Sequence, residues 1–267
     1  MYQFVDTIEA GSAADRLPAE AMSINGVYIE NEISGYRTLQ VIGREIYGSE
    51  ITEIEMGQSD GAQFFYRRNA QRNIRVMYQL ISKSAEDFRE KFNALNKILN
   101  QERAVFVFAD EPDKHFIGTI SDAGDVEGGL LNVTGEFTLR CSDPYKYGEQ
   151  VEVTLNSTLS QTVTAEGEYE TPCIIQITPL NDNSDLTITG IARDPITRED
   201  EPVTIKNLKK SIPVIVDGET CTVTQQGANK YPETDFWEFP SLLPGENQIT
   251  LSNAANTVTI KYRPRYI

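Results

Sequence analysis

The chain has 267 residues, of which 39% are hydrophobic and 24% are charged, a composition typical of soluble globular proteins. Its formal net charge of −16 argues against a large phosphate-binding surface, because nucleic-acid binders need clustered cations. No apolar run approaches the roughly 20 residues that a membrane-spanning helix requires, so no membrane insertion is expected. The length favours two domains, with one large all-β domain as the alternative.

Three cysteines, Cys141, Cys173 and Cys221, lie far apart in the sequence. Their odd number and wide spacing favour reduced thiols over a disulfide framework, which predicts synthesis in a reducing compartment. The first residues, MYQFVDTIEAG, lack the basic flank and the apolar stretch of a secretory signal, so we expect no export signal there.

The first half of the chain alternates turn signals with strand signals. Asn25-Gly26 lies between two short apolar runs and predicts a tight hairpin, since both residues tolerate a positive φ. Residues 35–63 are rich in Gly and Glu and predict a long excursion with one or two short strands. Residues 74–81, IRVMYQLI, have the composition of a strand.

One principal helix is predicted after this strand. Ser84 supplies a capping oxygen, and acidic residues follow it in the first turn. Phe88, Phe92, Leu95 and Leu99 recur at intervals of four, three and four residues. This spacing forms one apolar stripe, so we expect the helix to pack on a sheet.

Residues 105–120, VFVFADEPDKHFIGTI, place Asp110, Glu111 and Asp113 around Pro112 between two apolar runs. Three carboxylates so close together could form an acid/base site, a cation cage or a solvated hairpin tip. The hairpin tip is favoured, with Pro112 fixing φ and with Asp110 and Asp113 capping backbone amides. A glycosidase remains open as an alternative, because the spacing of its carboxylate pair is spatial rather than sequential.

Beyond about residue 150, helical periodicity disappears and short strand-like runs alternate with turn clusters. Asp217-Gly218 and Pro244-Gly245 are turn signals in this part of the chain. The prediction is therefore a mainly β protein with an α+β domain over 1–148 and a β-sandwich of jelly-roll type over 149–267.

Few residues point to catalysis or to metal binding. His115 is the only histidine, which excludes a multi-histidine metal site, and no G-x-S-x-G motif accompanies it. The acidic stretches 121–129 and 181–185 do not match a calcium-binding EF-hand loop and read as turns. No catalytic residue, metal ligand or cofactor-binding motif is predicted.

Residues 64–75 interleave three aromatic residues with arginines, a pairing that could stack bases and hold phosphates. In so acidic a chain, arginines more plausibly pair with carboxylates of the same or a neighbouring subunit. The predicted subunit-interface residues are Arg67, Arg68, Arg72 and Arg75.

A second aromatic cluster, Phe236, Trp237 and Phe239, lies in the sequence DFWEF. Exposed aromatic rings can stack on sugars, which gives the hypothesis of a carbohydrate-binding adhesin. The competing interpretation, a packed edge of the core, is favoured.

Several stretches together resemble one known family. They are GYRTLQVIGRE at 35–45, FADEPDKHFIGTI at 108–120, FTLRCSDPYKYG at 137–148 and FPSLLPGENQITL at 239–251, followed by the closing KYRPRYI. In order and spacing they are similar to the distal tail proteins of siphophages, which also occur in prophages and in tail-like bacteriocins.

The resemblance implies a structural virion protein, not an enzyme, that is synthesised in the cytoplasm of the bacterial host and is located at the tail tip. It implies a homo-hexameric ring between the tail tube protein and a tail-associated lysin or fibre hub protein, with a receptor-binding protein as a further partner. The implied domains are a tail-tube-like ring domain and a galectin-like sandwich. A carbohydrate-binding adhesin of the tail tip is the alternative, although no inserted sugar-binding domain is visible.

A ring of this kind has to let DNA pass through without specific binding. Duplex DNA presents one charge per about 1.7 Å, so a cationic channel would bind it. We therefore expect part of the surplus acid to line the channel. Contacts between identical subunits of a ring are heterologous, so complementary patches are required.

Overall fold

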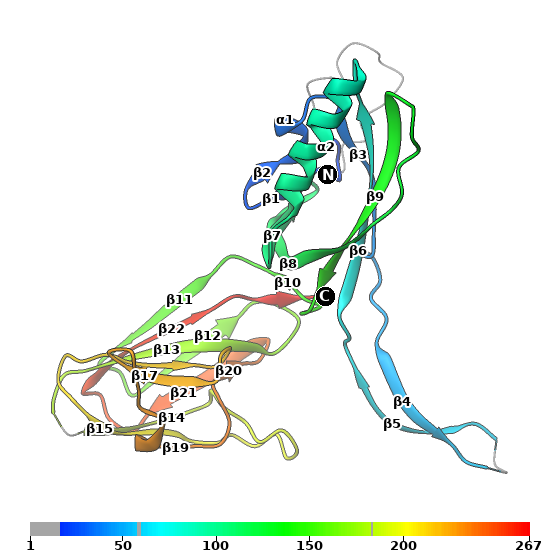
Figure 1. Cartoon of the computed structure of the whole chain (residues 1–267). Coiled ribbons are helices and arrows are strands. Elements are labelled where there is room, and N and C mark those ends of the chain that lie inside the picture. Colours follow the sequence, from blue (N-terminus) through cyan, green and yellow to red (C-terminus); the bar gives the residue numbers. More distant parts are fainter. Residues whose placement is uncertain (1–16, 58–59, 183) are drawn as a thin grey trace. The chain divides into compact units, whose positions relative to one another are not determined.

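The computed structural model describes residues 17–57, 60–182 and 184–267, so the N-terminal stretch 1–11 lies outside it. The chain divides into two compact units, Met1–Lys146 and Tyr147–Ile267. Both are built largely from antiparallel strands (Figure 1). The prediction of a mainly β protein is confirmed.

The N-terminal unit contains an antiparallel sheet in the order β2-β1-β7-β8-β9-β6-β3. Its strands are β1 (Met22–Ile24), β2 (Val27–Tyr28), β3 (Tyr36–Ile42), β6 (Arg72–Ile81), β7 (Ala104–Phe108), β8 (Glu111–Ala123) and β9 (Asn132–Cys141). The two-residue strand β10 (Lys146–Tyr147) lies at the division between the units.

The predicted hairpin at Asn25-Gly26 is confirmed. Ile24 pairs with Val27, so these two residues form the whole connection between β1 and β2. Their φ values are 49° and 87°, which is the left-handed region that a two-residue hairpin turn requires.

The free edge of β3 is closed by carboxylates. The backbone N–H of Thr38 donates to Glu30 Oε1, and that of Val41 donates to Glu20 Oε2, both at 3.0 Å. Glu30 belongs to the short helix α1 (Ile29–Glu32). Because these edge donors are already satisfied, the edge is a poor template for an incoming strand.

Helix α2 (Ala85–Leu99) begins where the sequence predicted. Ser84 is its N-cap, and the Ser84 side chain accepts the backbone N–H of Asp87 at 3.2 Å. Leu95 is buried, while Phe88, Phe92 and Leu99 are partly buried against the core of the sheet. The apolar stripe therefore packs on the sheet, as expected.

The region 35–63 differs from the prediction of an excursion with one or two short strands. It contains β3, which belongs to the main sheet, then β4 (Glu50–Glu55) and the start of β5 (Ala62–Arg68). Composition alone predicts few and short strands here, because Gly and Glu are depleted in strands. Pairing with β6 and the pairing of β4 with β5 override that local preference.

The C-terminal unit is a β-sandwich of two main antiparallel sheets, in the orders β11-β22-β13-β16-β17-β18 and β12-β21-β14-β15-β19 (Figure 1). The first sheet contains β11 (Val151–Asn156), β13 (Thr171–Pro179), β16 (Val214–Asp217), β17 (Thr222–Gln225), β18 (Ala228–Asn229) and β22 (Asn256–Tyr262). The second contains β12 (Ser160–Ala165), β14 (Ser184–Thr189), β15 (Val203–Leu208), β19 (Thr234–Asp235) and β21 (Gly245–Leu251). The remaining elements are η2 (Tyr231–Glu233), β20 (Ser241–Leu242) and β23 (Arg265–Tyr266).

Both sheets contribute to one apolar core. Ile175 and Ile260 from the first sheet and Ile188 and Ile205 from the second are completely buried in the same cluster. The hairpin predicted at Asp217-Gly218 is present, but residues 218–221 form a loop of four residues between paired Asp217 and Thr222.

The three cysteines are free thiols, with Cys141 and Cys173 buried and Cys221 exposed. Burial raises the pKa of the Cys141 thiol to about 11, so this thiol is unreactive at neutral pH. Among the described residues, no helix combines the length and the apolar character needed to cross a membrane.

The first turn of α2 generates a pH-dependent prediction. The Asp87 carboxylate accepts the backbone N–H of Lys83 at 2.7 Å and lies 3.1 Å from Lys91 Nζ. These contacts, the backbone hydrogen bond first, lower the pKa of Asp87. The stabilisation is therefore fully present above the ordinary aspartate pKa of about 4 and is lost as the pH falls through the lower pKa of the folded state.

We expect Asp87→Asn to lower the melting temperature at neutral pH, with a difference from wild type that shrinks below about pH 4. Thermal unfolding across a pH series measures this. Glu90→Gln, at an exposed position of the same helix, is the matched control and should follow wild type throughout. A difference for Asp87→Asn that does not change with pH would contradict the prediction.

Candidate functional site

Among the described strands, β4 and β5 pair only with each other and form a separate two-stranded sheet, which we call the arm. Figure 1 shows the arm as a ribbon that continues beyond β3 and β6. Every residue of both strands is exposed. Because an isolated two-stranded hairpin is at best marginally stable in water, the arm is a strong candidate for contact with another molecule.

The arm carries a concentration of exposed apolar side chains. Five of them are between 52% and 61% exposed: Ile51, Ile54, Phe64, Phe65 and Tyr66. Single exposed hydrophobic residues are ordinary on protein surfaces, but a contiguous group marks an interaction site. The arm is therefore the principal candidate functional site of the N-terminal unit.

Aromatic side chains lie on both faces of the arm. Tyr66 pairs with Thr52, and Phe64 pairs with Glu53 beyond an irregularity in the register. Neighbouring residues of a strand point to opposite faces, so Thr52 and Glu53, with their partners, do too. A hairpin that lay flat on one surface would present a polar outer face, and the arm does not.

Two of the four predicted interface arginines lie on the arm. Arg67 and Arg68 are exposed residues of β5. Arg68 Nη2 lies 2.8 Å from Glu50 Oε2, and both side chains remain more than half exposed. Such a surface ion pair contributes little to stability, so these arginines remain available to a partner.

The other two arginines lie on β6, where the strand alternates between buried and exposed residues. Arg75 is about half exposed and lies 3.9 Å from Glu136. Arg72 is only 1% exposed, so its proposed role as a surface contact is wrong. The sequence pattern treated all four arginines alike, but the alternation of the strand separates them.

The turn between β7 and β8 contains fewer residues than predicted. Phe108 pairs with Glu111, so Ala109 and Asp110 alone connect β7 to β8. Glu111, Pro112 and Asp113 already belong to β8. Pro112 therefore lies in a strand and does not set the geometry of the turn, in contrast to the prediction.

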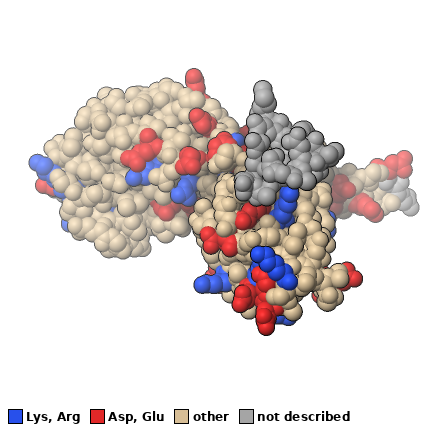
Figure 2. All heavy atoms as spheres, turned by 90° about the horizontal axis from the view of Figure 1, so that it is seen from above, with Lys and Arg blue, Asp and Glu red and all other residues tan. Residues whose placement is uncertain are grey.

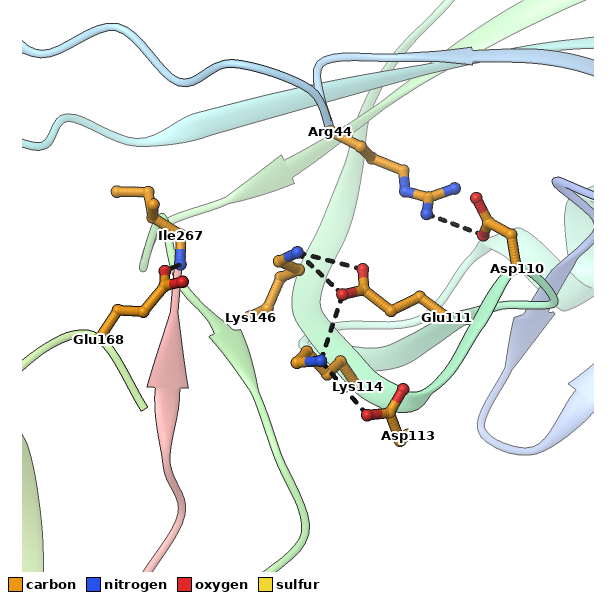
Figure 3. A network of polar contacts seen from close by, with 8 residues as sticks. All are labelled: Arg44, Asp110, Glu111, Asp113, Lys114, Lys146, Glu168 and Ile267. Atoms are coloured by element: carbon orange, nitrogen blue, oxygen red, sulfur yellow. Dashed lines mark hydrogen bonds and ion pairs between the residues drawn. The ribbon is translucent and has the colours of Figure 1, made fainter. Parts of the chain in front are cut away.

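Each carboxylate at this turn faces a cation (Figure 3). Asp110 Oδ1 lies 2.8 Å from Arg44 Nη2, and the two side chains are only 13% and 12% exposed. Glu111 Oε1 lies 3.0 Å from Lys146 Nζ and 3.4 Å from Lys114 Nζ. Lys114 Nζ also lies 3.2 Å from Asp113 Oδ2.

Figure 3 also shows a contact of the C-terminal unit, in which the backbone N–H of Ile267 donates to Glu168.

Ion pairs therefore surround these carboxylates, and the Asp113 carboxyl also accepts a hydrogen bond from its own backbone N–H. The hydrogen bond from Lys114 lowers the pKa of the Asp113 carboxyl. A general acid of a glycosidase needs the opposite shift, so the Asp113 environment does not suit a proton donor.

The described residues contain no group of three or more His, Cys, Asp or Glu side chains arranged to hold a metal ion. His115, the only histidine, lies within β8.

The aromatic cluster of the C-terminal unit is divided between the core and the surface. Phe236 is buried, and its ring lies 5.2 Å from Phe239 and 5.8 Å from Tyr231. Trp237 is 85% exposed. Of the three residues in the sugar-stacking hypothesis, Trp237 alone offers an open ring face.

Two family models match the chain, one in each unit. Residues 27–141 match the phage tail protein RIFT-related domain, and residues 166–266 match the C-terminal domain of the siphovirus-type tail component. No curated protein sequence matches the chain.

Solved structures agree with the family models. The chain is similar to the Dit protein of phage SPP1, with a TM-score of 0.78 and 16% identity, over 94% of this chain and 100% of that chain. It is also similar to a chain of the phage P2 baseplate, with a TM-score of 0.51 and 13% identity, over 92% and 97% of the two chains. At these identities the structural matches define the fold.

A sandwich unit, a sheet unit with one main helix and family matches in both define a structural component of a phage tail or baseplate, of siphovirus type. Within that class, the chain belongs to the distal tail protein family.

The two acids at the turn should differ in their effect on stability. Asp110→Ala leaves Arg44 shielded from water without its partner and should lower the free energy of unfolding by about 2 to 4 kcal/mol. Asp113 is 71% exposed, so Asp113→Ala is the matched control and should cost about 0.5 kcal/mol or less. Chemical denaturation measures both, and equal losses would contradict the assignment.

The segment that leads from β3 to the arm depends on Gly43. Its φ is +102°, and a Cβ at this position would lie 2.3 Å from the carbonyl oxygen of Asn73. We expect Gly43→Ala to lower the melting temperature of the protein, because the chain has to shift away from β6. Gly26 also has a positive φ but has open space around it, so Gly26→Ala should cost clearly less. Calorimetry compares the two variants, and equal losses would show that the close approach is unimportant.

Proposed function

We propose that the protein forms a homo-hexameric ring at the distal end of a long non-contractile phage tail, where it joins the tail tube to baseplate proteins. Membership of the distal tail protein family supports this role. The similar SPP1 protein is described as a paradigm of the hub of the adsorption apparatus in phages that infect Gram-positive bacteria. The second similar chain comes from a phage baseplate.

The observation that carries the proposal is the arm. Its strands expose apolar side chains on both faces, and no other described part of the chain covers them. In a ring, each subunit contacts the next through two different surfaces, so a projecting element has to meet an unlike surface on its neighbour. The arm supplies such an element, with Arg67 and Arg68 as its cationic contacts.

The further partners follow from the position at the tail tip. The tail tube protein would contact one side of the ring, and a tail-associated lysin or fibre hub protein would contact the other. A receptor-binding protein would attach on the outside. This role is structural and requires no catalytic residue.

The charge of the chain suits a channel through which DNA moves. The formal net charge is −16, and on the face in Figure 2 the basic side chains lie among acidic ones without a broad cationic area. Acidic residues lining the channel would repel the phosphate backbone and keep DNA from binding to the wall.

The ring is tested by the solution mass of the purified protein, with negative-stain images of the same fraction. We expect open rings with a mass of six times 29.9 kDa. Phe64→Asp combined with Tyr66→Asp places a charge on each face of the arm and should weaken association by about tenfold or more, because buried charges without partners are costly. Folding should be unaffected, since both side chains are exposed.

Leu159→Asp is the matched control, because Leu159 is similarly exposed but lies in the C-terminal unit. This variant should form rings like wild type. Rings that survive both arm substitutions would remove the arm from the interface. A wild-type protein that stays monomeric even with the tail tube and hub proteins would contradict the ring itself.

A further inference from the structure

Two short segments connect the arm to the sheet, and together they form the arm root: residues 43–49 lead out of β3, and residues 69–71 lead back into β6. The Tyr47 hydroxyl donates to the carbonyl oxygen of Ala70. Ser49 Oγ lies 3.0 Å from Asn69 Oδ1. The outgoing and returning segments are therefore held to each other.

Arg72 connects this root to the core. It is the first residue of β6, and its side chain is buried. The guanidinium carbon lies 4.6 Å from the ring centroid of Tyr47 in the root and 5.4 Å from that of Phe116 in the core. One planar cation thus contacts an aromatic ring of the arm root and an aromatic ring of the main sheet.

The chemistry of this position is unusual for a stabilising contact. None of the three guanidinium nitrogens of Arg72 has a hydrogen-bond partner among the described residues. Withdrawal from water lowers the pKa of Arg72, which reflects the cost of burying its charge. An apolar side chain is often as stable or more stable at a buried charged position. The contribution of arginine is its flat face, which stacks on aromatic rings in a defined orientation.

A second arginine fixes the same segment at another point. The guanidinium of Arg44 lies 4.1 Å from the ring centroid of Phe108 and pairs with Asp110. Phe108 in turn packs edge-on against Phe116, with centroids 6.1 Å apart. The outgoing segment 43–49 therefore contacts the Phe108–Phe116 pair at two points. Arg44 contacts Phe108 directly, and Tyr47 is connected to Phe116 through Arg72. Two fixed points define the direction of a segment.

We infer that Arg72 is a positioning residue that sets the direction in which the arm leaves the N-terminal unit. The inference rests on the proposed function, in which the arm docks on a second copy of the chain. An arm that already points toward its docking surface loses less conformational entropy on association. When only a fraction of molecules holds the competent direction, the apparent affinity falls by that fraction.

The test measures the direction of the arm and ring assembly separately. Spin labels at Thr52→Cys on β4 and Glu102→Cys after α2 report the distance across the root, in full-length protein that also carries Cys221→Ser. Thr52 and Glu102 are exposed, whereas Cys141 and Cys173 are buried. An excess of unlabelled protein keeps the measured distances within one chain.

Arg72→Met keeps an apolar stem and removes the planar cation. We expect a distance distribution at least about twice as wide and ring association about tenfold weaker, without a lower melting temperature. Arg89→Met, at an exposed position of helix α2, is the control and should match wild type in both measurements.

Tyr47→Leu removes the other side of the stack and decides the question if Arg72→Met does not fold. An unchanged distance distribution in the variant that folds would overturn the inference. A wider distribution with unchanged rings would support the positioning role of Arg72 and would count against docking by the arm. A failure of the positioning role of Arg72 is therefore distinguishable from a failure of the proposed docking by the arm.

Discussion

The packing of Phe108 against Phe116 is the contact on which the described features of the N-terminal unit converge. Both rings lie on the β7–β8 hairpin, whose two-residue turn brings their strands into register. Arg44 stacks on one ring and Arg72 on the other, so the segment that leads to the arm takes its position from this pair. The acidic turn thus belongs to the same structural unit as Arg72, one member of the arginine cluster at 67–75.

Local signals were sufficient for part of this fold. The turn at Asn25-Gly26 and the helix start at Ser84 follow from the conformational and hydrogen-bonding preferences of those residues, and both occur as predicted. The β-sandwich follows from alternating short runs and turns. The arm could not be predicted in the same way, because its strands have no buried face and therefore no alternation of apolar and polar residues.

The candidate site also combines features that have a local sequence signal with features that have none. The stretch 64–75 stands out in the sequence for its mixture of aromatic residues and arginines, but this pattern does not distinguish the buried Arg72 from the three exposed arginines. Whether an arginine is buried depends on the rings available to it, and those near Arg72 come from distant parts of the chain. The pairing of Asp110 with Arg44 spans 66 residues and leaves no local signal either.

The closed edge of β3 affects how copies of the protein can associate. An open edge strand can recruit further strands without limit, which is the route to fibrous aggregates. Glu20 and Glu30 occupy the donors of that edge with two hydrogen bonds. Growth by strand addition is thereby discouraged at this edge, so the main sheet of one subunit is not extended there by a strand of another.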